Sequence, residues 1–586
     1  MASASASDRL RLTAAVTASM FRGFAARLQA SQAMRWRWGT QGAQRLLLAP
    51  PDLRTPDPTL AGDMYAGRFL FAGHLMETAG RSPFETPAPS EAFSDALHGF
   101  GWLRHLRAAD TETSRALARS LIADWMDQHG HYRPASWKPQ VTARRVISWL
   151  SHSPMILADV ERPFFRRVLK MLTHQVRYLQ ATTNEAADPS AKLTCLSAMT
   201  FAGLAFQGWA LHQRRAGRWL GDELDRQILL DGGHISRNPD ALIDHLLDLL
   251  PLRQCYVARE LEPPVELTRA IDRMLPMIRF FRHTEGNLAQ FNGMGLTRPE
   301  RIATLLAYDE SRGDPMSNAV YSGFQRLQAG DTVAIADTGG PPPLNASSRA
   351  HAGCLSFELS SKAGRLIINC GAPVRAMESW DRAARSTAAH STAVIDDTSS
   401  CRFAATGWAR ARLGPVIVAG PRKVDVSRED GAAERGFRAS HDGYAADYGL
   451  IHERMLSLSD DGAMLSGEDG FLPAPGGRTS SQNQSFAIRF HLAPGVTTSA
   501  SSRQGRIVLT LVHETWVMEA EGADITVEES VYLSSLNGPR ATDQIVLRGD
   551  CAVQPHIRWR FRRLPAGSAE ETAPLETDGE TFLLPE

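Results

Sequence analysis

Three polar side chains in the stretch 347–395 have types and positions suited to proton transfer. His351 opens one expected strand, Asn369 closes the next, and His390 stands just before a third. A rigid sheet holds side chains at its strand ends in fixed directions, and such positions commonly carry function. Imidazole groups donate and accept protons near neutral pH. Two histidines and an amide in these positions indicate a site in a cleft rather than a packed core.

The strands that would hold these residues belong to a β-rich second half that begins near Tyr321. Short alternating or β-branched runs are separated there by turns rich in Gly, Asp, Ser and Pro, which is typical of an antiparallel sandwich. A hairpin turn is expected at Lys362-Ala363-Gly364, and the residues from about 566 are expected to fray. The expected strands cover residues 332–336, 355–359, 365–368, 393–395, 416–419, 486–492, 506–512, 515–519 and 544–547.

The first half of the chain has helical periodicity. The expected helices cover residues 93–109, 111–129, 141–151, 163–181, 192–207, 215–228, 240–250 and 263–281. Paired helices with short loops between them predict a toroid or solenoid whose concave face is open at one end. We predict an α+β multidomain chain, with a helical domain over residues 1–320 and a sandwich domain over residues 321–586. A ligand cleft is expected between the two.

Composition excludes several classes of protein. The chain has 586 residues, more than one hydrophobic core organises, and a formal net charge of +0, which argues against a nucleic-acid partner. Six cysteines without CxxC spacing argue against a disulfide framework and fit a reducing compartment. No run approaches the roughly 20 apolar residues of an integral membrane segment. The location is either cytoplasmic or periplasmic, with the cytoplasm favoured, and the oligomeric state is left open.

The segment 1–31 is rich in Ala and Ser and then amphipathic. The apolar residues expected close to one helical face are Leu10, Leu12, Val16, Met20, Phe24 and Leu28. Arg22 and Arg27 interrupt the apolar run that a secretion signal needs. Two interpretations stay open, a first helix packed on the protein or a helix that lies on a membrane surface or serves targeting. Next, Arg35-Trp36-Arg37-Trp38 suits either sugar stacking or cation–π packing.

The β-rich half resembles the heparinase II/III-type polysaccharide lyases. Their β-domain has a His at a strand start, a hairpin ending in Asp-x-Gly, and Ala-His shortly before a strand. The matching positions here are His351, Asn369-Cys370-Gly371 and Ala389-His390. The resemblance covers most of the chain and implies an incomplete (α/α) toroid followed by an antiparallel β-sandwich. It also implies a carbon–oxygen lyase that cleaves a heparin-like or other uronic-acid-containing glycan by β-elimination.

β-Elimination makes three physical demands on the site. The sugar carboxylate must be neutralised so that negative charge can develop when the C5 proton leaves. A base must reach that proton, and an acid must protonate the leaving oxygen. On the resemblance, His351 and His390 act as base and carboxylate neutraliser, while Asn369 and Arg385 bind the sugar. The alternative is that both imidazoles are hydrogen-bonded structural histidines.

The loop 231–239 resembles the family segment Asp-Gly-x-x-x-Glu-x-Ser-Pro-x-Tyr-His. The matching residues are Asp231, Gly232 and Pro239. The family's Tyr and His positions hold Ala241 and Leu242. Because that tyrosine is the family's usual acid and base, its absence puts the standard mechanism in doubt.

Other residues are candidates for the missing roles. His234 and Asn238 are the catalytic candidates from the loop, with Arg237 binding the substrate, and Tyr444 from the sandwich is a candidate acid. The alternatives are a helix-capping loop, in which Asn238 or Asp240 is the cap, and a tyrosine that packs in the sandwich. Both alternatives stay open at this point.

Further candidates come from the toroid. Trp137 would stack on a sugar ring, and Arg144 or Arg145 would clamp an anionic group. The two arginines suit ordinary ion pairs equally well. The family's carboxylate-neutralising Asn is expected within 184–194, where Lys192 supplies positive charge or is simply solvated.

A metal site is not predicted. Some family members bind zinc through the positions that His351, Asn369 and His390 hold here. A neutral amide is a poor zinc ligand beside a carboxylate, so zinc is kept only as an alternative and no other cofactor is expected.

Two functions are consistent with the sequence. The first is a lyase that acts on an acidic polysaccharide or oligosaccharide. The second is a carbohydrate-binding or envelope-assembly protein that keeps the lyase fold with altered chemistry, because a fold does not guarantee a reaction.

Overall fold

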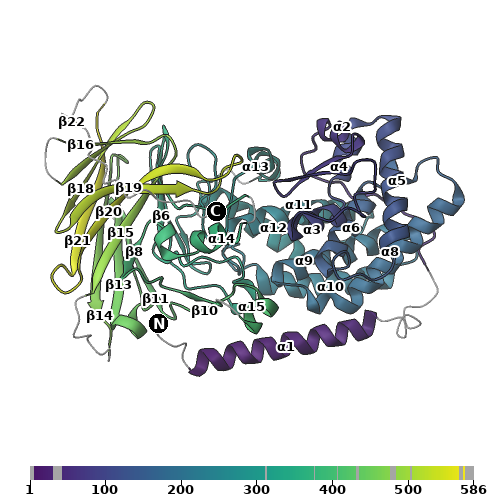
Figure 1. The fold of residues 1–586 in the computed structure, drawn as a ribbon, viewed down its shortest axis with the longest axis horizontal. Coiled ribbons are helices and arrows are strands. Elements are labelled where there is room, and N and C mark those ends of the chain that lie inside the picture. Colours follow the sequence, from purple (N-terminus) through teal and green to yellow (C-terminus); the bar gives the residue numbers. More distant parts are fainter. Residues whose placement is uncertain are drawn as a thin grey trace.

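The computed structural model describes residues 6–30, 42–310, 313–374, 377–404, 407–430, 434–475, 484–501, 505–565 and 572–573. The motif Arg35-Trp36-Arg37-Trp38 and nearly all of the tail from 566 lie outside the described residues. Figure 1 shows the helices gathered at one end of an elongated molecule and the sheets at the other. The predicted order of helices first and strands second is confirmed.

The helical half is built from helices that pack on one another around a shared hydrophobic core. Several helices start at clear capping signals, such as Ser90 before α3, the capping box at Thr111 before α5, and Asp188 with Pro189 before α9. The helices of this half are α2 (Thr59–Tyr65), α3 (Glu91–Gly99), α4 (Leu103–Ala109), α5 (Glu112–His129), α6 (Pro139–Ser151), α7 (Ser153–Leu157), α8 (Arg162–Thr182), the 3-10 turn η2 (Thr183–Glu185), α9 (Pro189–Ala205), α10 (Ala210–Gln227), α11 (Pro239–Ala258), α12 (Val265–Phe280) and α13 (Pro299–Leu306). A small hairpin, β1 (Arg68–Phe71) and β2 (His74–Glu77), lies beside them.

One predicted helix is two helices. The expected helix over 93–109 breaks between α3 and α4, because Phe100 adopts a left-handed φ of 58° that ends α3. The indole of Trp102 then donates to the carbonyl oxygen of Leu97 at 3.0 Å, which holds the two helices at an angle.

The sandwich half consists of two packed antiparallel sheets. One sheet, in spatial order, contains β11 (Val424–Asp430), β12 (Glu434–His441), β13 (Leu450–Ser459), β14 (Met464–Pro473), β21 (His556–Arg563), β18 (Thr515–Glu521), β17 (Arg506–Thr510), β16 (Thr497–Ser501) and β22 (Thr572–Ala573). The other contains β19 (Asp524–Tyr532), β20 (Arg540–Asp550), β15 (Ser485–Leu492), β7 (Gly364–Ile368), β6 (Phe357–Ser361), β5 (Thr332–Asp337), β4 (Phe324–Ala329) and β3 (Asn318–Ala319), with β8 (Ala393–Ile395) also paired to β15. Smaller elements are η3 (Leu344–Ala346), α14 (Glu378–Ala384), η4 (Thr387–Ala389), β9 (Arg402–Phe403), α15 (Trp408–Leu413), β10 (Ile417–Ala419) and α16 (Ala445–Tyr448).

The hairpin predicted at Lys362-Ala363-Gly364 is confirmed by the pairing of β6 with β7. The first of these strands starts at Phe357 rather than at Leu355, because Leu355 adopts a left-handed φ of 61° that extended backbone does not allow. The core between the sheets is aromatic, and the rings of Phe357 and Trp559 stack at 5.5 Å.

The two halves share apolar packing. Phe324, Val333 and Ile335 of β4 and β5 belong to the same hydrophobic cluster as the toroid core. The chain passes from α13 to β3 between residues 306 and 318. A domain boundary near residue 321 stays a prediction.

The first helix, α1 (Ala6–Ala30), lies along one edge of the molecule and spans both halves (Figure 1). The residues expected on one face are divided between two faces. Val16 is buried and Leu12 half-buried, whereas Leu10, Met20 and Phe24 are exposed. The helix therefore turns an apolar surface toward solvent as well as toward the protein.

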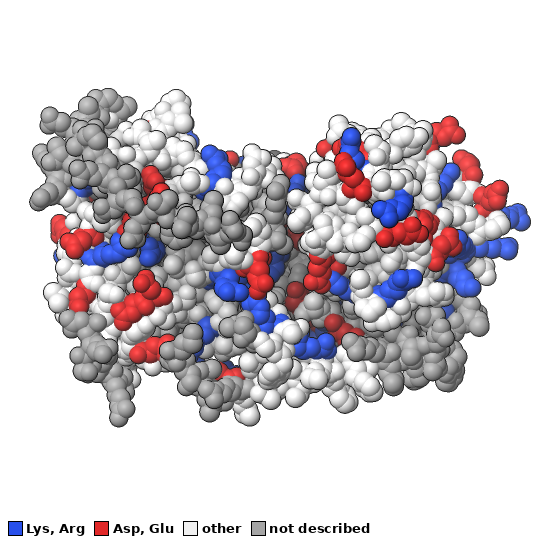
Figure 2. All heavy atoms as spheres, in the orientation of Figure 1, with Lys and Arg blue, Asp and Glu red and all other residues white. Residues whose placement is uncertain are grey.

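The surface has no dominant sign of charge in the view of Figure 2, where basic and acidic side chains are interspersed, as the net charge of +0 predicts. The described part of the chain contains no helix long and apolar enough to span a membrane. Each of the six cysteines is buried as a free thiol, and they are Cys195, Cys255, Cys354, Cys370, Cys401 and Cys551.

Candidate functional site

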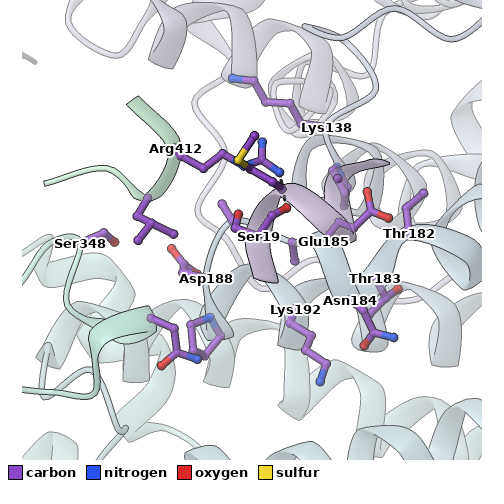
Figure 3. Close-up of a pocket in the computed structure, with 18 of the residues that line it drawn as sticks. Ser19, Lys138, Thr182, Thr183, Asn184, Glu185, Asp188, Lys192, Ser348 and Arg412 are labelled. Atoms are coloured by element: carbon purple, nitrogen blue, oxygen red, sulfur yellow. Dashed lines mark hydrogen bonds between the residues drawn. The ribbon is translucent and has the colours of Figure 1, made fainter. Parts of the chain in front are cut away.

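A pocket of about 1150 Å³ lies between the toroid and the sandwich. The toroid wall comes from the loop after α5, the end of α8, η2 and the start of α9. The sandwich wall comes from residues 344–348 and the end of α15, and α1 closes a further side. Figure 3 shows polar side chains from these elements around the same space. A concave space with a few converging polar groups is the usual form of a ligand site.

The segment between α8 and the first turn of α9 brings charged and amide side chains to the toroid wall, and they are Asn184, Glu185, Asp188 and Lys192. The carboxylate of Asp188 caps α9 by accepting the backbone N–H of Ala191 at 2.8 Å, which fixes this part of the wall. The ammonium group of Lys192 lies 2.7 Å from a carboxylate oxygen of Glu223. Asn184 and Glu185 are in the turn just before the cap. This is the segment in which the resemblance implies a carboxylate-neutralising asparagine.

Glu185 has the chemistry of a proton-transfer group. Burial raises the pKa of its carboxyl group to about 7, and the nearby guanidinium of Arg412 opposes that rise. A carboxyl group that titrates near neutral pH is suited to act as a base or an acid. No pattern in the sequence singled out this glutamate.

The aromatic residues of the pocket are not equally available. The indole of Trp137 is buried and donates to the carbonyl oxygen of His129 at 2.8 Å. Its ring packs edge-on against the buried ring of Tyr178, with centroids 5.1 Å apart. Tyr132 is 38% exposed. The predicted stacking role of Trp137 therefore fits Tyr132 better.

The structure brings His351 and His390 together. The Nδ1 atom of His351 lies 3.1 Å from the Nε2 atom of His390. The Nδ1 atom of His390 lies 2.7 Å from the carbonyl oxygen of Ser386, which only accepts hydrogen bonds, so His390 donates there and accepts from His351. Burial lowers the pKa of His390 to about 4 and the pKa of His351 well below its ordinary value. Both imidazoles are neutral and belong to the sandwich interior, and neither lines the pocket.

Asn369 is also part of the interior. Its backbone N–H and its side-chain amide both donate to the buried carboxylate of Glu358, at 3.1 and 3.3 Å. Its side-chain oxygen accepts the backbone N–H of Ser391 at 3.0 Å. The amide therefore joins β6, β7 and the turn before β8, and it has no oxygen left to face a sugar.

These three residues do not fit a zinc site. Both ring nitrogens of His390 and the amide oxygen of Asn369 are occupied by protein hydrogen bonds. Zinc would need lone pairs that these atoms already use. Within the described residues there is no group of three or more His, Cys, Asp or Glu side chains that could hold a metal ion.

His234 is placed behind the pocket rather than in it. Its Nδ1 atom accepts the backbone N–H of Ser236 at 3.1 Å, so its Nε2 atom donates to the side-chain oxygen of Gln227 at 2.9 Å. Gln227 in turn donates to the carboxylate of Glu223 at 2.8 Å, which is the partner of Lys192 at the pocket wall. Burial lowers the pKa of His234 well below its ordinary value. It is a neutral support for the wall, with no contact to His351 or His390.

Arg237 and Asn238 hold the loop in place. Asn238 is the cap of α11 and accepts the backbone N–H of Asp240 at 2.9 Å. Arg237 adopts a left-handed φ of 57° and sends its guanidinium from the toroid into the sandwich. Its acceptors are the carbonyl oxygens of Ser322, Gly323, Gly339 and Gly340 and the carboxylate of Asp337. With every donor used, Arg237 joins the two domains and has no group left for a substrate.

Arg144 and Arg145 are structural inside the toroid. Arg144 forms a bidentate ion pair with Asp248, at 2.8 and 2.9 Å. Arg145 is fully buried, donates to the side chain of Gln175 at 2.8 Å and lies 4.0 Å over the ring of Trp125. Both side chains point into helix packing rather than into the pocket.

Arg385 and Tyr444 are likewise committed. Arg385 donates to the carbonyl oxygens of Ala350 and Ser347, at 2.8 and 3.0 Å, and thereby fixes the loop that precedes His351. The hydroxyl of Tyr444 donates to the carbonyl oxygen of Ala393 at 3.0 Å within the sandwich core. The open alternative, a packed tyrosine, is the one that fits this geometry.

Comparison with known proteins identifies the family to which this chain belongs. The family description "Heparinase II/III-like, C-terminal" matches residues 311–560. FtsZ-localized protein C from Caulobacter vibrioides (strain NA1000 / CB15N) is 31% identical over 560 residues, which cover 92% of this chain and 96% of that protein. The chain belongs to the heparinase II/III-like family. This family member thus belongs to the family that the motifs at His351 and His390 implied.

Solved structures agree on the fold of this family member. Heparinase III superimposes with a TM-score of 0.71 at 13% identity, covering 92% of this chain and 90% of that chain. A mutant of heparan sulfate lyase HepC from Pedobacter heparinus superimposes with a TM-score of 0.64 at 16% identity, covering 88% and 85%. At these identities the likeness concerns the toroid and the sandwich alone.

Proposed function

We propose that this protein is a polysaccharide lyase that cleaves a uronic-acid-containing glycan by β-elimination in the pocket between toroid and sandwich. The observation that carries the proposal is the segment between α8 and α9, where Asn184 and Glu185 stand side by side in the chain at the wall of a pocket of about 1150 Å³. An amide and a carboxyl group that titrates near neutral pH are two of the groups that the reaction needs.

Roles follow from chemistry and position. The amide of Asn184 donates to the sugar carboxylate and withdraws charge as the C5 proton leaves. Glu185 accepts that proton, since a base is most effective when its pKa is near the working pH. The hydroxyl of Tyr132 protonates the leaving oxygen and its ring stacks on the sugar. Together they replace the family tyrosine, whose position holds Ala241.

The test is a direct assay of the product. β-Elimination leaves an unsaturated uronate that absorbs in the ultraviolet, so we expect absorbance to rise when the protein meets one member of a panel of acidic polysaccharides. Glu185→Gln should abolish the rise, whereas Glu77→Gln, an exposed position on β2, should not. Equal rates in both variants would remove Glu185 from the mechanism.

A second candidate function, glycan binding without cleavage, is favoured by one specific observation. The two histidines that the resemblance assigns to catalysis are neutral, buried and bonded to each other. The name of FtsZ-localized protein C supports a place for such a binding protein beside the division apparatus. Retained glycan binding without product, together with a fluorescent fusion that follows FtsZ in cells, would favour this candidate over the lyase.

A further inference from the structure

The helix α1 forms part of the pocket that the rest of the chain builds. It contacts α8 and η2 of the toroid and α15 and β10 of the sandwich, so it bridges both walls. Its residues on the pocket are Ala15, Ser19, Met20, Gly23 and Phe24. A polymer that enters this pocket from the side of α1 meets the helix first.

Arg412, at the end of α15, is a cation that faces this helix at the pocket. Its guanidinium donates to the backbone carbonyl oxygen of Ser19 and forms no ion pair with any carboxylate of the described residues. The contact depends on Gly23, where a Cβ atom would lie 2.3 Å from the Nη2 atom of Arg412. Figure 3 shows Arg412 reaching from the sandwich side toward Ser19, with Glu185 near them. A carbonyl oxygen is a weaker partner for a guanidinium than a carboxylate, which binds it bidentately.

The contact between α1 and the rest of the protein buries few apolar side chains. Among the described side chains of α1, the large apolar one that is buried is Val16, with 1% of its surface exposed. At the helix start, Asp8 binds the guanidinium of Arg422 at 3.0 Å. Of the α1 residues on the pocket, Ala15, Ser19 and Gly23 are small, and the larger Met20 and Phe24 are 61% and 66% exposed. Small residues remove little apolar area from water, so they stabilise the packing of α1 on the protein only weakly.

The larger apolar groups of α1 remain exposed to solvent, and Phe24 is one of them although it also borders the pocket. Leu10, Phe21 and Phe24 are 74%, 76% and 66% exposed. Their spacing, together with Ala14 and Thr17, is that of one continuous helical stripe. A helix that leaves its larger side chains in water and packs its small ones on the protein is not in the position that buries the most apolar surface. Such a helix is displaced at a low cost in free energy.

We propose that Arg412 is the specificity-determining cation that binds a uronate carboxylate of the glycan, and that α1 competes for it by presenting the carbonyl oxygen of Ser19. The inference rests on the proposed function, which supplies the acidic sugar. The helix covers the pocket when no glycan is bound, and an acidic chain replaces the single carbonyl with a carboxylate. The fraction of molecules in which α1 is displaced sets the fraction whose pocket is accessible, and therefore the apparent affinity for the glycan.

The experiment uses the full chain and one pair of substitutions on α1. Val16→Asp places a charge on the buried face, and Phe21→Asp places the same charge on the exposed face. Trypsin cleavage after Arg11 reports displacement of the helix, and calorimetry reports binding of uronate tetrasaccharides from heparosan, hyaluronan and alginate. We expect Val16→Asp to be cleaved faster and to bind at least about fivefold tighter than the unaltered chain. Phe21→Asp should change neither quantity.

A second substitution tests the cation. Arg412→Gln, added to Val16→Asp, should weaken binding by about tenfold, the size expected for one charge-assisted hydrogen bond. The same tetrasaccharides with their carboxylates reduced to alcohols should bind both proteins equally. Asp8→Asn, which loosens the helix start without touching the pocket, should act in the same direction as Val16→Asp to a smaller extent.

Each result has a defined meaning. If Val16→Asp frees the helix and affinity does not rise, or if Arg412→Gln changes nothing, the competition is wrong while the proposed function stands. If Val16→Asp is cleaved no faster than the unaltered chain, α1 is a fixed part of the fold and the inference is overturned. If no protein binds any of the tetrasaccharides, the proposed function for these glycans fails and the inference fails with it.

Discussion

The Nδ1 atom of His351 donates a hydrogen bond to the Nε2 atom of His390 across 3.1 Å, and the Nδ1–H group of His390 donates one to the carbonyl oxygen of Ser386. The two imidazoles thus share one hydrogen bond, and His390 has a second one to the backbone. Since both are buried, protonating either one would place an uncompensated charge in the interior. The pair therefore couples the stability of the sandwich to pH.

The first prediction concerns that coupling. The pKa of His390 is about 4 in the folded chain, below its ordinary value of 6.5, so the unfolded chain binds more protons between these two values. The contribution of His390 to stability is present above 6.5 and is lost as the pH falls toward about 4. His390→Gln should reduce the loss of unfolding free energy between about pH 7.5 and about pH 5 by about 2 kcal/mol. Urea denaturation at the two pH values measures it.

The control for this experiment is His513→Gln, since His513 is exposed. It should leave the pH dependence as it is in the unaltered chain. Equal pH dependence for His390→Gln and the unaltered chain would mean that His390 is protonated inside the fold.

The second prediction concerns the arginine that joins the domains. Arg237→Met leaves the buried carboxylate of Asp337 without its cation and should lower the free energy of unfolding by about 3–5 kcal/mol. Arg237→Lys should recover little of this loss, because a lysine cannot reach five acceptors in a plane. The double variant Arg237→Met with Asp337→Asn should be more stable than Arg237→Met alone. If the changes in unfolding free energy of the two single variants simply add in the double variant, the two residues do not interact energetically.

The third prediction concerns the buried arginine of the toroid. Burial lowers the pKa of Arg145 to about 9, and its guanidinium donates to neutral acceptors while lying over Trp125. Arg145→Lys should lower the free energy of unfolding by about 3 kcal/mol, since several buried acceptors lose their donor. Arg133→Lys, on the exposed loop nearby, should have no measurable effect. A shift in Tm of similar size in both variants would contradict the assignment.

The fourth prediction concerns the reaction. If Glu185 is the base, kcat/KM rises with pH and levels off above about 7, where the carboxyl group of the free enzyme is ionised. Glu185→Gln should lower kcat/KM by about 10²–10⁴-fold and leave glycan binding nearly unchanged. A rate that falls as the pH rises through 7 would assign Glu185 the role of acid instead.

The sequence predicted where the candidate site residues lie in the fold better than it predicted how exposed their side chains are. Asn369 follows the end of β7 and His390 stands shortly before β8 as expected, whereas His351 lies in a loop six residues before β6; the proximity of the two histidines was expected. Their burial was not, because the pattern along one strand does not reveal which other strands and loops cover its end. Glu185 carried no motif, yet its position in η2, just before the Asp188 cap of α9, sets it at the pocket wall.

The sequence by itself determined the order of helices and strands, the hairpin after β6 and the family, because periodicity, turn residues and motif spacing are local properties of a chain. Only the tertiary structure decided what each polar side chain does. Arg237 and Asp337 are 100 residues apart along the chain, and the carbonyl oxygen that Arg412 binds is 393 residues away. Partners so distant are brought together by the packing of whole domains. No local sequence pattern therefore distinguishes an arginine that joins two domains from one that is available to bind a sugar.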